Sequence, residues 1–204
     1  SILSTLNETE EFPSLSYVGV IGESMGQPQV DTWLSRAKLV NLFGPTEATV
    51  QVTRHVYTKE NPKANNIGRP YQHVTCYALN KKFQPLPIGV IGELYFGGPQ
   101  VCRGYLNRPE LTKERFIDHP QFGRLYRTGD YGRFLNDGNI EFHGRMDHQV
   151  KVRGYRMELG EIENTILTFD DIDQCVCFVK NDNLVSMVNS NVDIDNLKSY
   201  LKSE

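Results

Sequence analysis

Hydrophobic residues in the first quarter of the chain form two short runs that flank one amphipathic stretch. Residues 16–22 (SYVGVIG) form a β-branched run that ends in glycine, and residues 38–43 (KLVNLF) form an apolar run that Gly44 and Pro45 end. Such runs favour buried strands. Between them, residues 27–37 carry apolar side chains at helical spacing, which predicts an amphipathic helix. Strand, helix and strand within about 30 residues indicate a βαβ unit of a parallel sheet.

The pattern changes after Gly68 to short apolar runs separated by glycine and proline. The candidate strands are residues 73–79, 93–96, 131–135 and 140–143. The last two flank Asn-Asp-Gly-Asn at residues 136–139, which is a strong hairpin signal because Asp-Gly tolerates positive φ. Residues 109–116 predict a helix with proline in its first turn and Asn107 as its cap. We expect a small antiparallel barrel or sheet in this part.

A third pattern follows Asp147. It predicts a strand at residues 149–153, a helix through 159–169, strands at 174–180 and 184–188, and a last helix capped by Asp193 or Asp195. The chain is therefore predicted to belong to the α/β class. Its expected parts are an α/β segment at residues 1–70, a β-rich subdomain at 71–146 and a small α+β subdomain at 147–204.

Composition and charge exclude several classes of function. Of the 204 residues, 39% are hydrophobic and 23% are charged, which suits a globular protein that buries a core. The 22 basic and 25 acidic residues give a net charge of −3, which argues against a nucleic-acid partner. No apolar stretch approaches the roughly 20 residues of a membrane helix, so no membrane partner is expected. Four cysteines without a Cys-x-x-Cys pair favour a reducing, cytoplasmic setting.

Three patterns that could bind a metal or catalyse a reaction have simpler interpretations. Cys175 and Cys177 alternate on one strand face, but no second pair completes a tetrahedral zinc set, so structural thiols are expected. The five histidines lack ligand spacing and receive no role. Residues 191–195 begin like a calcium loop, but Asn196 replaces the turn glycine, so a helix cap is expected instead.

Four segments, taken together, resemble the motifs of adenylate-forming enzymes. Residues 41–47 (NLFGPTE) resemble N-x-Y-G-P-T-E, and residues 92–106 (GELYFGGPQVCRGYL) resemble GELxxxG followed by ARGYL. Residues 126–130 (YRTGD) match Y-R-T-G-D, and residues 144–163 (GRMDHQVKVRGYRMELGEIE) resemble the hinge motif. Their order and spacing agree with the family, and the likeness covers nearly the whole chain. The hinge segment and the residues after Gly104 are most similar to adenylation domains of nonribosomal peptide synthetases.

The resemblance implies a fold and a reaction. The fold would be the C-terminal part of the large adenylation domain, with an α/β segment and a small antiparallel β-barrel, followed by a truncated C-terminal domain. The reaction would join an amino acid to AMP from ATP with Mg²⁺, and then transfer the acyl group to the phosphopantetheine thiol of a carrier domain. Its partners would be the peptidyl carrier and condensation domains of the parent synthetase. Such chemistry requires charge neutralisation, positioning of two reactants and exclusion of water.

The resemblance also assigns roles to single residues. Glu47 would hold Mg²⁺, which prefers carboxylate oxygen, and Thr46 would donate a hydroxyl to a phosphate. Phe43 stands where the family has tyrosine and keeps a ring that can stack on adenine. Asp130 would accept hydrogen bonds from both ribose hydroxyls, and Asp147 would be the hinge about which the small domain rotates. The ATP site would comprise Asn41, Phe43, Gly44, Thr46, Asp130, Phe142 and Arg145.

By alignment with the family, five residues would line the pocket for the substrate side chain: Gly19, Ile21, Leu42, Val50 and Gln51. Gly19 leaves room, three of the positions are apolar, and Gln51 can donate or accept a hydrogen bond. This lining favours an uncharged amino acid of medium or large size. Lys151 follows the hinge and would approach the site as a catalytic residue in the thioester-forming state.

The sequence leaves alternatives open about activity. The chain opens at Ser1 and lacks the family's upstream phosphate loop, its substrate-binding Asp segment and its C-terminal catalytic Lys. We therefore expect a fragment that does not adenylate at a normal rate by itself. An acyl- or aryl-CoA ligase of the same superfamily is one alternative. A non-catalytic remnant of an adenylation domain, kept as an interaction module, is another.

Overall fold

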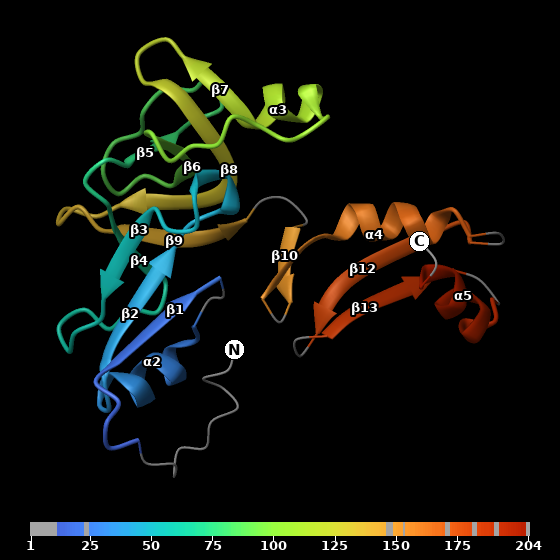
Figure 1. Cartoon of the computed structure of the whole chain (residues 1–204), viewed down its shortest axis with the longest axis horizontal. Helices are drawn as coiled ribbons and strands as arrows, with labels where there is room; N and C mark the ends of the chain where they lie inside the picture. The colour runs from blue at the N-terminus through green and yellow to red at the C-terminus, as the bar shows by residue number, and fades with distance from the viewer. Residues whose placement is uncertain are drawn as a thin grey trace. The chain divides into compact units, whose positions relative to one another are not determined.

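The computed structural model forms two compact units, Ser1–Met146 and Asp147–Glu204 (Figure 1). The residues that the structure describes are 12–22, 25–145, 149–152, 154–169, 172–180, 183–189 and 192–202. The hinge predicted at Asp147 lies outside them.

The first unit begins with the predicted βαβ element. Strands β1 (Tyr17–Ile21) and β2 (Lys38–Phe43) are parallel, and helix α2 (Gln27–Leu34) connects them. Gly26 caps the start of the helix, and its backbone N–H donates to the side chain of Gln29 at 2.8 Å. The helix ends three residues before the predicted limit. A core of Val20, Met25, Val30, Trp33, Leu39 and Tyr57 holds the helix against the strands, and Figure 1 shows α2 beside β1 and β2.

Two further strands join this element to the rest of the unit. Strands β3 (Thr53–Val56) and β4 (Asn66–Pro70) are antiparallel to their neighbours, and β4 pairs β9 (Ile140–Arg145). Neither β3 nor β4 was predicted, because both contain polar residues and lack an apolar run. The buried hydroxyl of Thr53 donates to the carbonyl of Ile67 at 2.6 Å, which ties the two strands together. The sheet therefore continues across residue 70, and the subdomain boundary there stays a prediction.

The β-rich middle part is antiparallel, as predicted. Its strands are β5 (Thr75–Leu79), β6 (Gly92–Gly97), β7 (Phe116–His119), β8 (Gly123–Phe134) and β9. The order along the sheet is β4-β9-β8-β6-β5, and β7 pairs the first half of β8. The long β8 therefore contacts three neighbours and carries two predicted motif residues, Asp130 and Thr128. Its fully buried Leu125 and Tyr126 anchor it in the unit.

The hairpin predicted at residues 136–139 is confirmed. Gly138 adopts φ of +81°, and its N–H donates to the carbonyl of Leu135 at 2.9 Å. Helix α3 (Pro109–Arg115) is also present, but the prediction that Asn107 caps it is wrong. Asn107 instead takes a left-handed φ of 56° in the preceding turn, and the helix begins after Arg108. Asparagine tolerates that conformation better than most residues, which explains its place in the turn.

The second unit is a small α+β fold. Strands β10 (Gln149–Val152) and β11 (Tyr155–Glu158) form one hairpin, and β12 (Cys175–Lys180) and β13 (Asn183–Val188) form another. Helices α4 (Leu159–Leu167) and α5 (Ile194–Leu201) complete it. Its buried core consists of Leu159, Ile166, Ile172 and Cys177. Strand β11 was not predicted, because its residues belong to a densely charged stretch that favours a solvated surface.

The cap predicted at Asp193 is confirmed, and the two cysteines alternate on one strand as predicted. The carboxylate of Asp193 accepts the N–H of Asp195 at 2.9 Å and caps α5. The sulfur atoms of Cys175 and Cys177 lie on one face of β12, 4.0 Å apart, and both thiols are free. Among the described residues, no three or more His, Cys, Asp or Glu side chains gather where they could hold a metal. A search of the same residues also finds no helix with the length and apolar character to cross a membrane.

Candidate active site

Three residues of the predicted adenosine site come together where β2, β4 and β9 meet. The rings of Phe43 and Phe142 have centroids 5.8 Å apart and are tilted by 49°. The amide of Asn41 donates to the carbonyl of Asn66 at 3.3 Å. Phe142 is held at the same place, because its N–H donates to the carbonyl of Asn65 at 2.8 Å. Long-range strand pairing thus brings Phe142 next to the ring and the amide of the residue 41–47 segment.

Polar groups beneath Asn41 support its position. Asn66 is buried, and its side-chain oxygen accepts the N–H of Gly68 at 2.8 Å. The hydroxyl of Tyr57 donates to the carbonyl of Ala64 at 3.1 Å. Burial raises the pKa of Tyr57 to about 12, although a hydrogen bond with Asn41 opposes this rise. Tyr57 therefore stays a neutral hydrogen-bonding group under Asn41. The sequence analysis identified none of these supporting residues.

Asp130 and Arg145 form an ion pair across β8 and β9. The Nη1 atom of Arg145 donates to Oδ1 of Asp130 at 2.8 Å, and the side chains are only 18% and 9% exposed. The hydroxyl of Thr128 accepts the N–H of Asp130 at 2.8 Å, which fixes the backbone there. A bulge in the β8–β9 pairing lies just beyond Asp130, and bulges often re-aim side chains next to functional sites. Two of the predicted ATP-binding residues are thus in direct contact.

A compact turn after β2 carries the predicted metal and phosphate residues. Thr46 and Glu47 lie on a short 3₁₀ helix, η1 (Thr46–Ala48), directly after Gly44-Pro45. A side chain at Gly44 would clash, because its Cβ would lie 2.5 Å from the carbonyl oxygen of Val50. The chain then turns through Thr49 and Val50 at φ of 58° and 67°. These are strained values for β-branched residues, and such strain is concentrated at functional sites.

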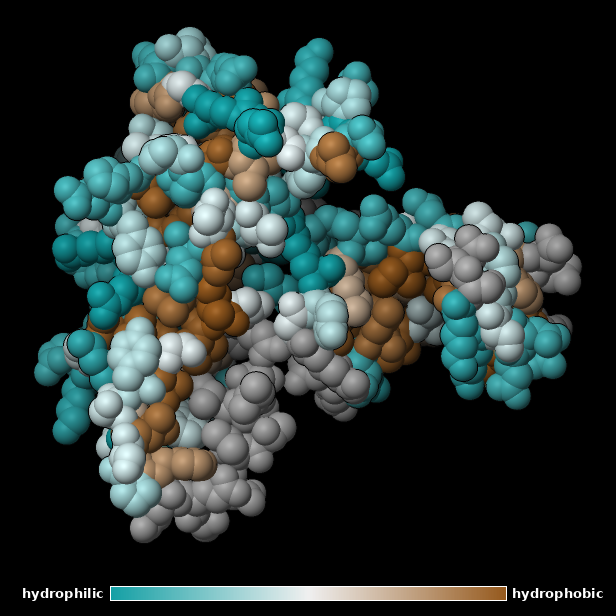
Figure 2. Space-filling view, in the orientation of Figure 1, coloured by the Kyte–Doolittle hydropathy of each residue, from teal (hydrophilic) through white to brown (hydrophobic). Residues whose placement is uncertain are grey.

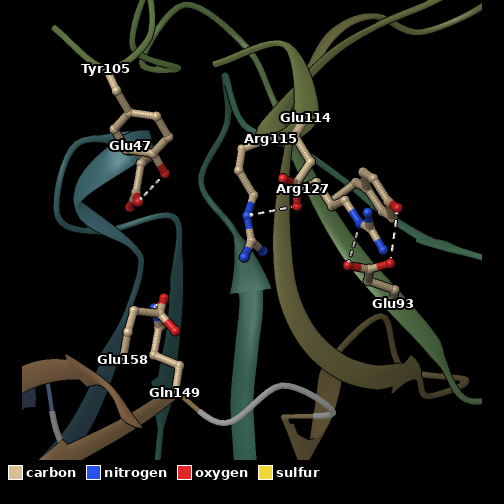
Figure 3. Close-up of polar contacts among 9 residues, drawn as sticks. Glu47, Glu93, Tyr105, Glu114, Arg115, Arg127, Gln149 and Glu158 are labelled. Atoms are coloured by element: carbon tan, nitrogen blue, oxygen red, sulfur yellow. Dashed lines mark hydrogen bonds and ion pairs between the residues drawn. The ribbon is translucent and has the colours of Figure 1, made fainter. Parts of the chain in front are cut away.

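Glu47 is held by a residue that the sequence analysis did not assign. The hydroxyl of Tyr105 donates to Oε1 of Glu47 at 2.6 Å, and Figure 3 shows the two side chains pointing toward each other. Glu47 is 8% exposed. Burial and the hydrogen bond to Glu47 raise the pKa of the Tyr105 phenol well above its usual range, so the hydroxyl keeps its proton. Tyr105 belongs to the quoted CRGYL segment, but nothing in the sequence indicates that it contacts Glu47.

The predicted pocket residues fall into two groups. Gly19 and Ile21 lie two residues apart on β1 and so point to the same face of the sheet. Leu42 lies on the neighbouring strand β2, directly opposite Ile21. Val50, which is 56% exposed, and Gln51 lie in the turn after η1. Figure 2 shows brown hydrophobic residues reaching the surface in the region of β1 to β4 and β9. Ile21 is also 41% exposed, so two apolar side chains of the predicted lining reach the surface.

Two tyrosines contact the predicted pocket residues. The Cε1 atom of Tyr17 lies 3.2 Å from the position that a Cβ at Gly19 would occupy, and Cδ1 of Leu42 lies 3.4 Å from it. The hydroxyl of Tyr71 donates to the side-chain oxygen of Gln51 at 3.2 Å. Tyr17 shares the strand face of Gly19, so the strand alternation contained a signal for it. The contact between Tyr71 and Gln51 depends on tertiary structure alone.

The other predicted residues lie in the second unit. Lys151 lies on β10, where it is the register partner of Arg156 on β11. Asp147 lies outside the described residues. The roles predicted for both stay predictions.

The donor set at Glu47 suits Mg²⁺ and does not suit a dedicated metal cage. The described residues offer no cluster of three or more metal-binding side chains. Mg²⁺ is commonly held by one or two carboxylates together with substrate phosphates and water. A nearly buried carboxylate at Glu47, with the hydroxyl of Thr46 on the same short helix, therefore fits an ion that arrives with a nucleotide.

Comparison with known proteins identifies the family. Residues 2–106, about half of the chain, match the family described as "AMP-binding enzyme". The chain therefore belongs to the AMP-binding enzyme family. Bacitracin synthase 3 from Bacillus licheniformis is 45% identical over 184 residues, which cover 89% of this chain. The chain spans only 3% of that relative's length.

Solved structures agree in fold. An adenylation domain of Vibrio cholerae, AlmE, in complex with glycyl-adenosine-5′-phosphate superposes with a TM-score of 0.83 and 30% identity. The match covers 93% of this chain and 39% of AlmE. PA1221, an NRPS protein containing adenylation and PCP domains, matches with a TM-score of 0.79 and 28% identity, over 90% of this chain and 39% of that one. The predicted α/β class is confirmed, and the chain is part of an adenylation domain of the nonribosomal peptide synthetase type.

Proposed function

We propose that this chain supplies the adenosine-binding part of a domain that activates an amino acid with ATP. In the first step the substrate carboxylate attacks the α-phosphorus, the bond to pyrophosphate breaks, and aminoacyl-AMP forms. In the second step a phosphopantetheine thiolate of a carrier domain attacks the acyl carbon, and AMP leaves. The family match and the similarity to adenylation domains support this assignment.

The observation that carries the proposal is the meeting of Phe43 and Phe142 beside Asn41. Two aromatic faces next to an amide suit a purine, since a ring can stack and the amide can bond its edge. The carboxylate of Asp130 can accept a hydrogen bond from a ribose hydroxyl. Arg145 orients this carboxylate through their ion pair, and its guanidinium suits phosphate oxygens as well. These residues bind and orient the nucleotide, and holding both reactants in place lowers the entropic part of the barrier.

Glu47 and Thr46 are proposed to hold the phosphate end of ATP. Mg²⁺ supplied with ATP would neutralise charge on the phosphates, and Glu47 offers the carboxylate oxygen that this ion prefers. The hydroxyl of Thr46 would donate to a phosphate oxygen. The turn that carries both is braced by strand β2 and by the residues around Tyr105, so the two groups are positioned before ATP arrives.

The pocket favours an uncharged amino acid of medium or large size. Gly19, Ile21, Leu42 and Val50 offer room and apolar surface, and Gln51, held by Tyr71, offers one hydrogen-bonding group. A charged substrate side chain would lose its hydration there without a charged partner among these five positions. Peptidyl carrier and condensation domains are the proposed partners, and Lys151 is proposed to act in the thioester-forming state after rotation at Asp147.

The test is ATP–pyrophosphate exchange by the complete adenylation domain that contains this sequence, assayed against each of the twenty amino acids. We expect exchange with an uncharged amino acid, and a loss of at least a hundredfold in Asp130→Asn and Glu47→Gln. Preference for Asp, Glu, Lys or Arg would contradict the proposed pocket. Absence of exchange with every amino acid, in a folded domain that also fails to bind ATP, would favour a non-catalytic remnant.

Two further assays separate the remaining alternatives. Formation of a thioester with free coenzyme A from a fatty or aryl acid would favour an acyl- or aryl-CoA ligase over a synthetase. The chain of residues 1–204 by itself is expected to show no exchange at the rate of the complete domain. Exchange at the full rate by these residues alone would show that the upstream phosphate loop is not needed.

A further inference from the structure

Tyr105 and Glu47 are joined by a short hydrogen bond between distant parts of the chain. The distance of 2.6 Å from the phenol oxygen to Oε1 lies in the range of charge-assisted O–H···O⁻ bonds. Such bonds are stronger than those between neutral groups, and limited access to water strengthens them further. Glu47 is 8% exposed, so the phenol restrains the orientation of a carboxylate that water reaches poorly.

Tyr105 is itself fixed by its neighbours. Its N–H donates to the hydroxyl of Thr112 at 2.9 Å, and its ring packs edge-on against Phe116 with centroids 5.4 Å apart. Gly104 just before it has φ of +146°, and a Cβ there would lie 2.4 Å from a methyl group of Thr112. The phenol therefore projects from a segment with little freedom to move.

The same segment is bonded to the backbone of the η1 turn. The N–H of Cys102 donates to the carbonyl of Glu47 at 2.8 Å. The hydroxyl of Thr49 donates to the carbonyl of Gln100 at 2.7 Å. Residues 100–105 thus hold Glu47 at its backbone, at its side chain and at the turn that follows. Three separate hydrogen bonds therefore fix Glu47 and the turn after it. A single surface contact would not hold the carboxylate in one orientation.

A second tyrosine–glutamate pair in the same unit has a different character. The hydroxyl of Tyr95 donates to Oε2 of Glu93 at 3.0 Å, while Arg127 forms an ion pair with Oε1 at 2.8 Å. A guanidinium both orients a carboxylate and neutralises its charge, as Figure 3 shows for Glu93 and Arg127. A phenol orients a carboxylate and leaves its charge in place. Tyr105 contributes a neutral hydroxyl to Glu47, so it can orient this carboxylate without adding a charge of its own.

We propose that Tyr105 is a positioning residue for Glu47, which it holds in the orientation that binds the divalent cation of MgATP. This inference rests on the proposed function, because it takes Glu47 as the carboxylate that meets that ion. Hydrogen-bonded partners of metal-binding carboxylates typically account for about 10–100-fold in metal affinity. Tyr105 would act only through Glu47 and would not touch the substrate.

The test compares Tyr105→Phe with the unmodified complete domain. Phenylalanine keeps the ring and its packing on Phe116 and removes only the hydroxyl. ATP affinity is measured by calorimetry at a series of Mg²⁺ concentrations, which gives a binding readout that needs no turnover. We expect the Mg²⁺ concentration for half-maximal enhancement of ATP binding to rise about 10–100-fold. ATP affinity in the presence of EDTA should not change, because the adenosine contacts are intact.

Tyr95→Phe is the matched control, since it removes the same atom from the other tyrosine–glutamate pair. It should leave the Mg²⁺ dependence within threefold of the unmodified domain, whatever it does to the melting temperature. A shift below threefold in Tyr105→Phe, or an equal shift in Tyr95→Phe, overturns the inference and leaves the proposed function standing. An unmodified domain whose ATP affinity does not respond to Mg²⁺ overturns the proposed metal role of Glu47, and the inference with it.

Discussion

The guanidinium of Arg145 donates to the carboxylate of Asp130 at 2.8 Å, and the two residues are register partners on β9 and β8. The pair joins the end of the YRTGD segment to the start of the hinge segment. Two motifs that are separate in the sequence are thus connected by a nearly buried ion pair. This contact has consequences for both stability and nucleotide binding.

We predict that Arg145→Met destabilises the first unit by about 1–3 kcal/mol at neutral pH, because it leaves the Asp130 carboxylate nearly buried without its cation. Asp130→Asn removes the negative charge that needs the cation. The loss of stability in the double variant should therefore be smaller than the sum of the losses in the two single variants. Urea unfolding of the four proteins gives the coupling energy. Coupling below about 0.5 kcal/mol would show that the contact contributes little.

A second prediction concerns pH and His55. This histidine is 4% exposed, and burial lowers its pKa below the ordinary value of 6.5, although the carbonyl of Asn61 opposes the shift. Below pH 6.5 this histidine binds a proton in the unfolded chain but stays neutral in the folded chain. The free energy of unfolding therefore falls as pH decreases. The slope from this one site cannot exceed about 1.4 kcal/mol per pH unit.

The measurement is the free energy of unfolding between pH 7.5 and 5. His55→Phe should lose this part of the pH dependence, whatever its effect on overall stability. His73→Gln is the matched control, because His73 is exposed, and it should keep the slope of the unmodified protein. An unchanged slope in His55→Phe would show that another group titrates in this range.

A third prediction tests the close backbone approach at Gly44. In Gly44→Ala the new Cβ would lie 2.5 Å from the carbonyl oxygen of Val50 and 2.8 Å from the nitrogen of Val52. Backbone atoms cannot yield as a flexible side chain can, so we expect a loss of about 1–3 kcal/mol by overpacking. Thermal unfolding of the first unit measures this loss of stability.

Gly160→Ala provides the contrast in helix α4. A Cβ at Gly160 meets no atom within 4 Å, and alanine favours a helix over glycine by about 0.5–1 kcal/mol. This variant should stabilise the second unit. Equal effects of the two substitutions would contradict the steric explanation of Gly44.

A fourth prediction concerns substrate choice. Gly19→Val in the complete domain would place side-chain atoms where Tyr17 and Leu42 already approach within 3.2 and 3.4 Å of the Cβ position. Tyr17 is 45% exposed and can shift, so folding should be nearly unaffected. We expect kcat/KM to fall at least tenfold for the preferred amino acid and less for a smaller one. An unchanged preference would exclude Gly19 from the pocket.

The sequence predicted those elements whose signal is local. The βαβ unit and the 136–139 hairpin follow from apolar periodicity and from one Asp-Gly turn, and both are present. Strands β3 and β4 escaped prediction because neither contains an apolar run, and β4 also pairs with a strand far along the chain, as with Asn66 opposite Glu141. Their stability comes from pairing and from buried hydrogen bonds, which no short window of sequence contains.

The candidate site shows the same division. The resemblance pointed to Glu47 and Asp130 because each stands in a recognisable motif. Tyr105 lies in a quoted motif too, but its hydrogen bond to Glu47 spans two motifs and becomes visible only in three dimensions. Tyr71 and Asn66 lie outside every quoted motif, and their contacts with Gln51 and Asn41 could not be read from the sequence.

The strained turn at Thr49 and Val50 bears on any attempt to redirect this domain to a new amino acid. One tight bend carries the carboxylate proposed for the cation and two of the five residues proposed to select the substrate, Val50 and Gln51. Exchanging Val50 or Gln51 alone would therefore perturb reactivity together with selectivity. Grafting the whole loop of residues 44–52 along with its bracing segment, residues 100–105, would transplant the recognition surface and keep the catalytic geometry intact.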